Sequence, residues 1–489
     1  MSGFVPGDLM SFGPILVLAG GGVLLVVIDA LLGRRSGFPW SIPTLLVLAL
    51  AVGTAVAQWS TPRSAGSLSW LLAIDRFALF VAVLVCVSAA LTVVLSESYL
   101  RRIGRVRGEF YSLLLLSCSG MVLFAATNEL ITLFLALELL SIPVYILSGY
   151  LRDDLRSGEA AMKYFFLGAL SSAVFLLGIA FIYGSTGTTN LLQVVQRGTE
   201  TPGLLTGGVL LLLTGFLFKI ASVPFHMWAP DVYEGAPTTV TAFMATAVKA
   251  AAFGALLRVI GLAPDLVGPI PLEKLLWWLA VLTMSVGNLA ALTQSNVKRM
   301  LAYSSIAHAG YLLIAVTVYA GTGDAQALTG LLYYLIAYTL MTIGAFAFVV
   351  AFGDENLEMG SYGALGWRYP ALGIGMSLFM ISLAGIPPTA GFFGKYTIFR
   401  NAVDHGYVPL VVIAVLNSAL SVAYYFRVMV TLYMRPASGE VKAGSGIAVG
   451  VVVAVCAVGV LWAGFGPDGW LPGVPTLLSW AQDSVLALR

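Results

Sequence analysis

Apolar runs long enough to cross a membrane recur along the whole chain. A helix of about 20 apolar residues spans the hydrocarbon core of a bilayer, and only 10% of the 489 residues are charged while 59% are hydrophobic. The runs are continuous and do not alternate with polar residues, which argues against a transmembrane barrel. The sequence therefore predicts an all-α integral membrane protein with about 14 transmembrane helices. The predicted spans cover residues 14–33, 38–58, 77–97, 109–126, 128–150, 158–184, 203–228, 237–261, 273–293, 299–320, 325–352, 370–402, 407–434 and 444–465.

Basic residues are divided unequally between the two sets of loops. One set holds Arg34, Arg35, Arg101, Arg102, Arg105, Arg107, Arg152, Arg156, Lys298, Arg299, Arg368, Arg427, Arg435 and Lys442. The other set holds Arg63, Arg76, Arg197, Arg258, Lys274, Arg400 and Arg489. Cytoplasmic loops carry the excess of lysine and arginine. We therefore expect the first set to be cytoplasmic and both termini to lie on the outer side of a bacterial cell membrane.

Two of the predicted spans are interrupted by proline. Pro224 lies in one run, the pair Pro387–Pro388 lies in the other, and each is the fourth span of a block of five. An odd number of helices per block turns the second copy upside down, as in the inverted repeats of many transporters. We expect two inverted five-helix repeats, each with a broken helix. The expected divisions are three helices in 1–108, the repeats in 109–262 and 263–436, and a last helix and tail in 437–489.

Four ionisable residues lie deep inside apolar runs. They are Glu138 in LFLALELLSIP, Lys219 in GFLFKIASVPF, Lys249 in ATAVKAAAFG and Lys395 in GFFGKYTIF. A charge at such a depth costs roughly 3 kcal/mol and is functional by default. Lysine can lose its proton when its surroundings change, whereas arginine cannot. The sequence therefore predicts a proton relay. The alternative is a static ion pair that fixes helix packing.

Two further residues could extend this relay. His308 follows Ser304 by four residues in MLAYSSIAHAGY, so the two share a helix face. It could link the two halves, because histidine both donates and accepts protons, or it could simply bond to a neighbouring helix. Lys163 lies within two turns of a helix start and could instead extend to the membrane surface.

Cofactor ligands are scarce in the sequence. The three cysteines, Cys86, Cys118 and Cys456, are far apart in apolar runs, and the sequence contains no CxxC motif. Disulfide, zinc and iron–sulfur readings therefore lack ligands. We expect neither a metal nor a redox cofactor in this chain.

Several motifs together resemble a known family. FKIASVPFHMWAPDVYEGAPTTVTAFMATAVKAAAF, NVKRMLAYSSIAHAGYLL and SLAGIPPTAGFFGKYTIF are similar to the antiporter-like membrane subunits of NADH-quinone oxidoreductase, respiratory complex I. With ELLSIPVYILSGY and EAAMKYFFLGALSSA they cover about 109–400, and DVYEGAP and EAAMKYF look most like subunit N. The resemblance implies that Glu138 pairs with the broken-helix Lys219. It also implies that Lys249 lies towards a central polar axis and that Lys395 is the terminal lysine.

The resemblance also implies a function and partners. The chain would translocate protons, coupled to quinone reduction elsewhere in the complex, while NADH, FMN, iron–sulfur clusters and quinone bind to partner subunits. Further antiporter-like subunits and the lipid bilayer would surround it, and no nucleic acid is implied. A subunit of a multisubunit cation/proton antiporter shares the fold and is the alternative. A scaffold that anchors a peripheral arm and pumps nothing is a third possibility, and such a scaffold should tolerate the loss of the buried lysines.

Overall fold

The computed structural model is a bundle of long helices. It describes residues 12–32, 38–60, 70–197, 201–262, 272–437, 441–444, 446–465 and 476–488. Within these ranges, 13 helices are long and apolar enough to cross a membrane. The broken pair α17 and α18 lies at the remaining predicted span. The prediction of an all-α membrane protein is therefore confirmed. Arg34, Arg35, Arg63 and Arg489 lie outside the described residues.

The helices follow the predicted order. The N-terminal group is α2 (Gly13–Leu32), α3 (Ser41–Trp59) and α4 (Arg76–Arg102). The first block is α5 (Gly108–Ala126), α6 (Leu130–Ser148), α7 (Leu155–Thr186), the short α8 (Leu191–Arg197), α9 (Pro202–Lys219), α10 (Trp228–Gly235), and α11 (Thr238–Phe243) continued through a π-helical turn, η2 (Met244–Val248), into α12 (Lys249–Leu262). The second block is α13 (Leu272–Leu292), α14 (Val297–Thr322), α15 (Ala325–Phe352), α16 (Leu365–Arg368), α17 (Pro370–Ala384), α18 (Ala390–Asp404) and α19 (Val408–Met434). The chain continues with α20 (Ile447–Phe465) and α21 (Leu477–Leu486).

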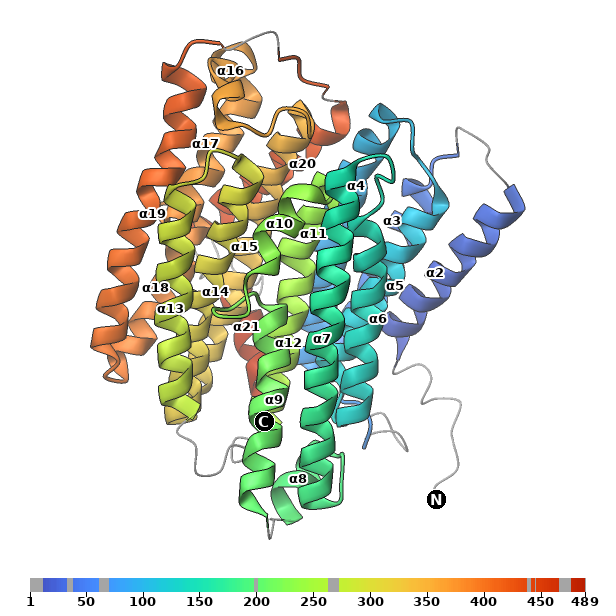
Figure 1. The fold of residues 1–489 in the computed structure, drawn as a ribbon, viewed down its shortest axis with the longest axis vertical. Coiled ribbons are helices and arrows are strands. Elements are labelled where there is room, and N and C mark those ends of the chain that lie inside the picture. The colour runs from blue at the N-terminus through green and yellow to red at the C-terminus, as the bar shows by residue number, and fades with distance from the viewer. Residues whose placement is uncertain are drawn as a thin grey trace.

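The two blocks lie side by side, with α2 and α3 at one edge (Figure 1). Figure 1 also shows that α9 lies below α10 whereas α17 lies above α18, so the two broken helices run in opposite directions. That reversal is what an inverted repeat requires. Residues 238–260 of the span formed by α11, η2 and α12 are all buried, and most of α14 and α15 is buried as well. Polar side chains on these central helices are therefore held away from lipid.

Both predicted breaks are present and share one geometry. Helix α9 ends at Lys219, and Ala221 adopts a left-handed conformation with φ of 57°. The Ser222 amide then donates to the Leu217 carbonyl at 2.8 Å. This 6→1 bond after a left-handed residue is the Schellman ending of a helix.

The second break repeats this ending. Gly385 is left-handed with φ of 83°, and the Ile386 amide donates to the Ile381 carbonyl at 3.1 Å. In both copies a proline, Pro224 or Pro388, follows the left-handed residue by three positions and is preceded by a cis peptide bond. The second break accommodates φ above zero with glycine, whereas the first does so with alanine, which tolerates it less well.

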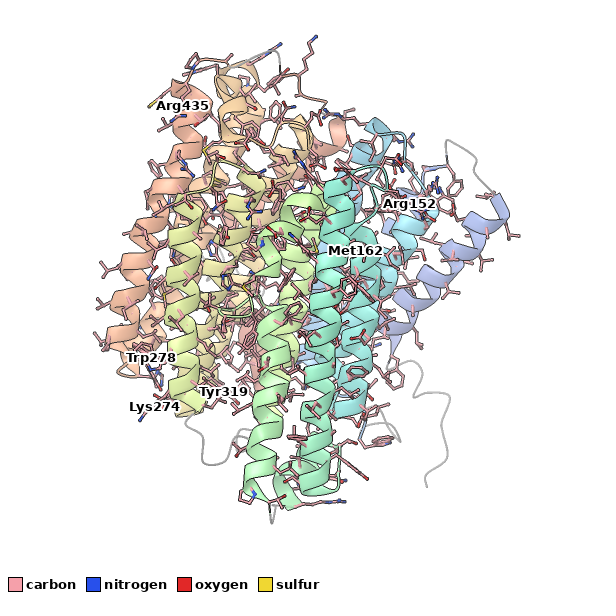
Figure 2. The ribbon with its side chains drawn as sticks, in the orientation of Figure 1. Arg152, Met162, Lys274, Trp278, Tyr319 and Arg435 are labelled. Carbon is pink, nitrogen blue, oxygen red and sulfur yellow. The ribbon has the colours of Figure 1, made fainter. Side chains whose placement is uncertain are left out.

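Two of the basic residues that were predicted to lie in loops are buried inside the bundle. Arg258 lies in α12 with 1% of its side chain exposed, and it donates to both carboxylate oxygens of Asp75 at 2.5 and 2.7 Å. Lys298, in the first turn of α14, is also 1% exposed. The loop assignment was therefore wrong for both residues, because sequence windows cannot tell a helix end packed inside the bundle from one facing solvent. Figure 2 shows Arg152 and Arg435 at one end of the bundle and Lys274 at the other.

The Arg258–Asp75 pair ties α12 to the start of α4. Removing one partner of a buried pair leaves an uncompensated charge, which costs about 3 kcal/mol or more. We expect Arg258→Gln to lower the thermal stability of the detergent-solubilised protein. Adding Asp75→Asn should recover part of the loss, because the remaining charge is removed. Equal stability of Arg258→Gln and the unmodified protein in a thermal-shift measurement would contradict the assignment.

Candidate functional site

Lys219 lies at the carboxyl end of the first half-helix. Its side chain is 4% exposed. Its ammonium lies 3.4 Å from the Tyr145 hydroxyl and 5.2 Å from the centre of that ring. The negative end of a helix dipole favours a cation at this position. The break that ends α9 therefore also provides a site for a protonated lysine.

Glu138 lies on the same helix as Tyr145, seven residues earlier, so both side chains project from one face of α6. No ion pair between described residues joins Glu138 to Lys219, and the Glu138 Oε1 atom is buried without a hydrogen-bond partner in the described part of the chain. Tyr145 is therefore the group that reaches Lys219 from α6. A closed Glu138–Lys219 pair, as the resemblance implies, is absent from this conformation.

Lys395 reaches the equivalent place in the second repeat from the other direction. It lies on α18, is 4% exposed, and donates to the Leu383 and Ala384 carbonyls at 3.1 and 3.0 Å. These carbonyls lie at the end of α17, where they have no partner within the helix and a lysine can bond them. Both lysines therefore occupy the negative end of a broken half-helix, although one precedes its proline in the sequence and the other follows it.

Lys395 also borders an open cavity. The cavity has a volume of about 600 Å³ and is lined by residues of α18 and α19, among them Ser418, which accepts from Lys395 at 2.9 Å. Its walls are mostly apolar, including Phe399 and Val415. The terminal lysine therefore borders an opening large enough to hold several water molecules.

Lys249 is held by the neighbouring central helix. It begins α12 directly after the π-helical turn, is 2% exposed, and donates to the backbone carbonyl and the hydroxyl of Ser305, both at 2.5 Å. The Tyr338 ring centre lies 5.2 Å from the ammonium. π-helical turns are frequent at functional sites. No carboxylate among the described residues lies within ion-pair distance of Lys249.

His308 is the centre of a hydrogen-bonded cluster. Its Nδ1 lies 2.5 Å from the Tyr334 hydroxyl and its Nε2 lies 3.0 Å from the Tyr425 hydroxyl. Tyr425 also bonds the Ser304 hydroxyl at 2.5 Å. The predicted shared face of positions 304 and 308 is thus occupied by one tyrosine that contacts both residues.

The structure brings together part of the predicted relay. Lys249 bonds Ser305, and the tyrosine that contacts His308 bonds the adjacent Ser304. Both groups of contacts therefore lie on one turn of α14. Tyr311 extends the cluster, with its ring centre 5.7 Å from that of His308 and 4.9 Å from the Lys395 ammonium. No hydrogen bond between described residues joins Lys219 to Lys249. Water or a different conformation must bridge that interval if a proton is to cross it.

Lys163 lies apart from this buried chain. Its side chain is 41% exposed and pairs with Glu159 at 2.6 Å and Asp231 at 2.7 Å. Arg299 from α14 also bonds Asp231, and these residues, with Glu234, line an open cavity of about 170 Å³. Burial alone would raise the pKa of Asp231, but the hydrogen bonds from Lys163 and Arg299 bring it below its usual value. This cluster joins α7, α10 and α14 at the surface.

Buried tyrosines that were not predicted from the sequence surround the charged residues. Tyr145, Tyr311, Tyr334, Tyr338 and Tyr425 are buried and contact a candidate residue. A signal was available, because a tyrosine inside an apolar span needs a partner for its hydroxyl. Position along the helix alone did not reveal which tyrosines face inward.

The described residues offer few groups for metal binding or thiol chemistry. Among those residues no group of three or more histidine, cysteine, aspartate or glutamate side chains could hold a metal ion. The three cysteines are buried and unpaired with one another. The chemistry that the arrangement supports is transfer of protons between lysine, histidine, hydroxyl groups and water.

Comparisons with known proteins point to one family. A family model described as NADH:quinone oxidoreductase/Mrp antiporter, TM, matches residues 127–421. The chain is 44% identical over 481 residues to NADH-quinone oxidoreductase subunit N of Trichlorobacter lovleyi, covering 96% of both chains. It is 44% identical to subunit N of Myxococcus xanthus, covering 88% of this chain and 89% of that one.

Solved structures agree. A chain of respiratory complex I from Thermus thermophilus is 38% identical, with a TM-score of 0.78, and the match covers 92% of this chain and 96% of that one. A chain of the Mrp complex from Dietzia sp. has a TM-score of 0.80 but only 20% identity, so it shares the fold alone.

Proposed function

The chain belongs to the family of subunit N of NADH-quinone oxidoreductase, the proton-translocating membrane subunit of that complex, and we propose that Glu138, Lys219, Lys249, His308 and Lys395 carry its protons. The observation that carries this proposal is the environment of the lysines. All three are at most 4% exposed, lie within apolar helices, and have no carboxylate within ion-pair distance among the described residues. An ammonium group in such a place is stabilised weakly and can lose its proton. Static packing does not require that property.

The proposed order follows the contacts. A proton would pass between Glu138 and Lys219 by way of Tyr145, then to Lys249, and on through Ser305, Ser304 and His308 to Lys395. Lys163 belongs to the exposed ion cluster, and we propose that it adjusts the charge near α10 without carrying a proton itself. We also propose that redox chemistry takes place in partner subunits, which would bind NADH, FMN, iron–sulfur clusters and quinone.

The location and the repeat limits are also part of the proposal. The end of the bundle that carries Arg152 and Arg435 would face the cytoplasm of a bacterial cell, with both termini outside. The repeats would occupy 109–262 and 263–436, after three helices in 1–108 and before the C-terminal segment 437–489. Other membrane subunits of the complex, including antiporter-like ones, would contact the chain. Labelling of single introduced cysteines at each end, from either side of the membrane, tests the orientation.

The function is tested on the assembled complex. Inside-out vesicles that contain the chain with its partners should acidify when NADH is oxidised and quinone is reduced. A cation/proton antiporter would instead exchange ions without NADH. The similarity to the Mrp complex supports only a shared fold and does not favour this alternative. Stoichiometric copurification with an NADH-oxidising assembly would support the proposal, whereas ion exchange by the chain without NADH would favour the antiporter.

The cluster around His308 gives a specific prediction. Tyr425→Phe removes the hydroxyl that contacts both Ser304 and His308, so we expect NADH-driven pumping to fall several-fold with little change in assembly. The matched control is Tyr333→Phe, which removes an equally buried hydroxyl that donates to the Ala463 carbonyl away from the relay. An equal effect of the two variants on acidification would argue against a relay through Tyr425.

A further inference from the structure

Helix α4 lies outside both repeats but carries a line of buried hydroxyl groups. Ser88, Thr92, Ser96 and Tyr99 follow one another at spacings of four, four and three residues, which places them on one face. Each is at most 4% exposed. Serine and threonine inside membrane helices gather at helix–helix contacts, where their hydroxyls can bond to a neighbouring helix.

That face looks towards the helix of Lys249. Val81 projects from the same side of α4, and a Cβ placed on Gly254 of α12 would lie 3.1 Å from its side chain. Helix α4 also contacts α11, η2 and α15. Those elements contribute Thr239 and Thr339, which are buried as well. The hydroxyl face is therefore enclosed by the central helices and does not meet lipid.

Four of these hydroxyls have no protein partner among the described residues. They are the side-chain oxygens of Ser88, Ser96, Thr239 and Thr339. Leaving a buried donor unsatisfied costs about 1–3 kcal/mol, so such groups normally bond to ordered water. The four come from three helices that contact one another, so water between these helices would satisfy them.

The upper end of this line is a carboxylate. Asp354 follows α15 and has 23% of its side chain exposed. It accepts hydrogen bonds from the hydroxyls of Tyr99 at 2.5 Å and of Thr238, the first residue of α11. The buried Lys298 ammonium lies 3.5 Å away. Asp354 is therefore a titratable group that is partly exposed to solvent and also contacts residues at the ends of α4, α11 and α14.

The lower end of this line lies at the depth of Lys249. Ser88 precedes Tyr99 by eleven residues, and Lys249 follows Thr238 by eleven residues. At a rise of 1.5 Å per residue, both lie about 16 Å below Asp354. Ser96 and Thr239 fall between the two ends, whereas Thr339, 13 residues before the end of α15 at Phe352, lies about 20 Å down and therefore below Lys249. The hydroxyls therefore cover the depth from the surface carboxylate to the buried lysine.

We propose that Asp354 and the hydroxyls of α4 and α11 form a water-lined route that delivers protons to Lys249. The route rests on the proposed function, since it supplies a proton to a lysine of the relay. Asp354 takes a proton from bulk water, bridging waters pass it along the hydroxyls, and the neutral Lys249 amine receives it. The route assigns α4, outside both repeats, a part in transport.

Two substitutions test whether the entrance of the route carries protons. Asp354→Asn keeps an oxygen for Tyr99 and Thr238 but cannot carry a proton, and it also removes the anion beside the buried Lys298 ammonium. Thr239→Val leaves that pair intact and removes an unpartnered hydroxyl at nearly constant volume. We expect each variant to slow NADH-driven acidification of inside-out vesicles several-fold, and the complex that carries Thr239→Val should assemble normally. The matched control is Thr317→Val, since Thr317 is equally buried but donates to the Leu313 carbonyl of its own helix. This control should pump normally.

The outcomes separate the route from the relay. If Asp354→Asn and Thr239→Val pump normally while Lys249→Met does not, the route is wrong and the relay stands. If Lys249→Met pumps normally, the relay role of Lys249 fails, and the route loses its destination. A high-resolution map of the unmodified complex gives a second readout that needs no variant. We expect ordered water bonded to Ser96 and Thr239, and dry packing at both hydroxyls would overturn the route.

Discussion

Replacing Lys219 with arginine is expected to lower NADH-driven proton pumping at least about tenfold, within the loss that follows removal of a positioned proton-transfer group. Arginine keeps the positive charge and bonds carboxylates well, but it does not release its proton. Lys219 is 4% exposed and lies at the carboxyl end of α9, where a permanent charge would satisfy the helix dipole. A purely structural role would therefore accept arginine. The measurement is acidification of inside-out vesicles, with assembly checked by native electrophoresis.

A matched substitution controls for the size of arginine. Lys163→Arg makes the same change at a lysine that is 41% exposed and paired with Glu159 and Asp231, so we expect nearly normal pumping. Glu138→Gln should resemble Lys219→Arg, because the buried carboxylate is lost. Assembly and pumping at the normal rate in Lys219→Arg would remove Lys219 from the relay.

Lys249→Met is expected to reduce pumping through this subunit at least about tenfold without weakening the fold. Among the described residues, the Lys249 ammonium forms hydrogen bonds only to Ser305 and has no carboxylate within ion-pair distance. The side chain is 2% exposed. Burial of such a charge is unfavourable, and replacing a buried charged group with an apolar one of similar volume is often neutral or stabilising. We therefore expect acidification to fall at least about tenfold. The thermal stability of the complex should stay equal or rise.

The two readouts together separate function from packing. A lysine kept for packing would lower stability when removed and would affect pumping only through poor assembly. The control is Met284→Leu, an apolar exchange at a fully buried position of α13, which should change neither readout strongly. A stable Lys249→Met complex that pumps at the normal rate would contradict the relay at this position.

The amino-acid sequence alone determined the class of protein and most of the element order. Apolar runs of about 20 residues admit few alternatives to transmembrane helices, because every backbone polar group must be satisfied within the bilayer. Proline in two of the runs predicted both breaks, since it removes a backbone donor and clashes with the preceding turn. Buried lysines were visible for the same reason, because a charge in an apolar run is rare and costly.

The tertiary structure decided which groups these charges meet. The family resemblance implied that Lys219 pairs with Glu138, and only the packed helices show that Tyr145 is the group of α6 within hydrogen-bond distance of its ammonium. Spacing along the chain could not reveal that Lys219 and Lys395 reach the same end of a broken helix from opposite sides of their prolines, because that depends on how α17 and α18 fold back. Arg258 and Lys298 looked like loop residues until packing buried them. Hydrophobic periodicity fixes how a helix meets lipid, but contacts between polar side chains depend on helix rotation and register, which only the packed bundle determines.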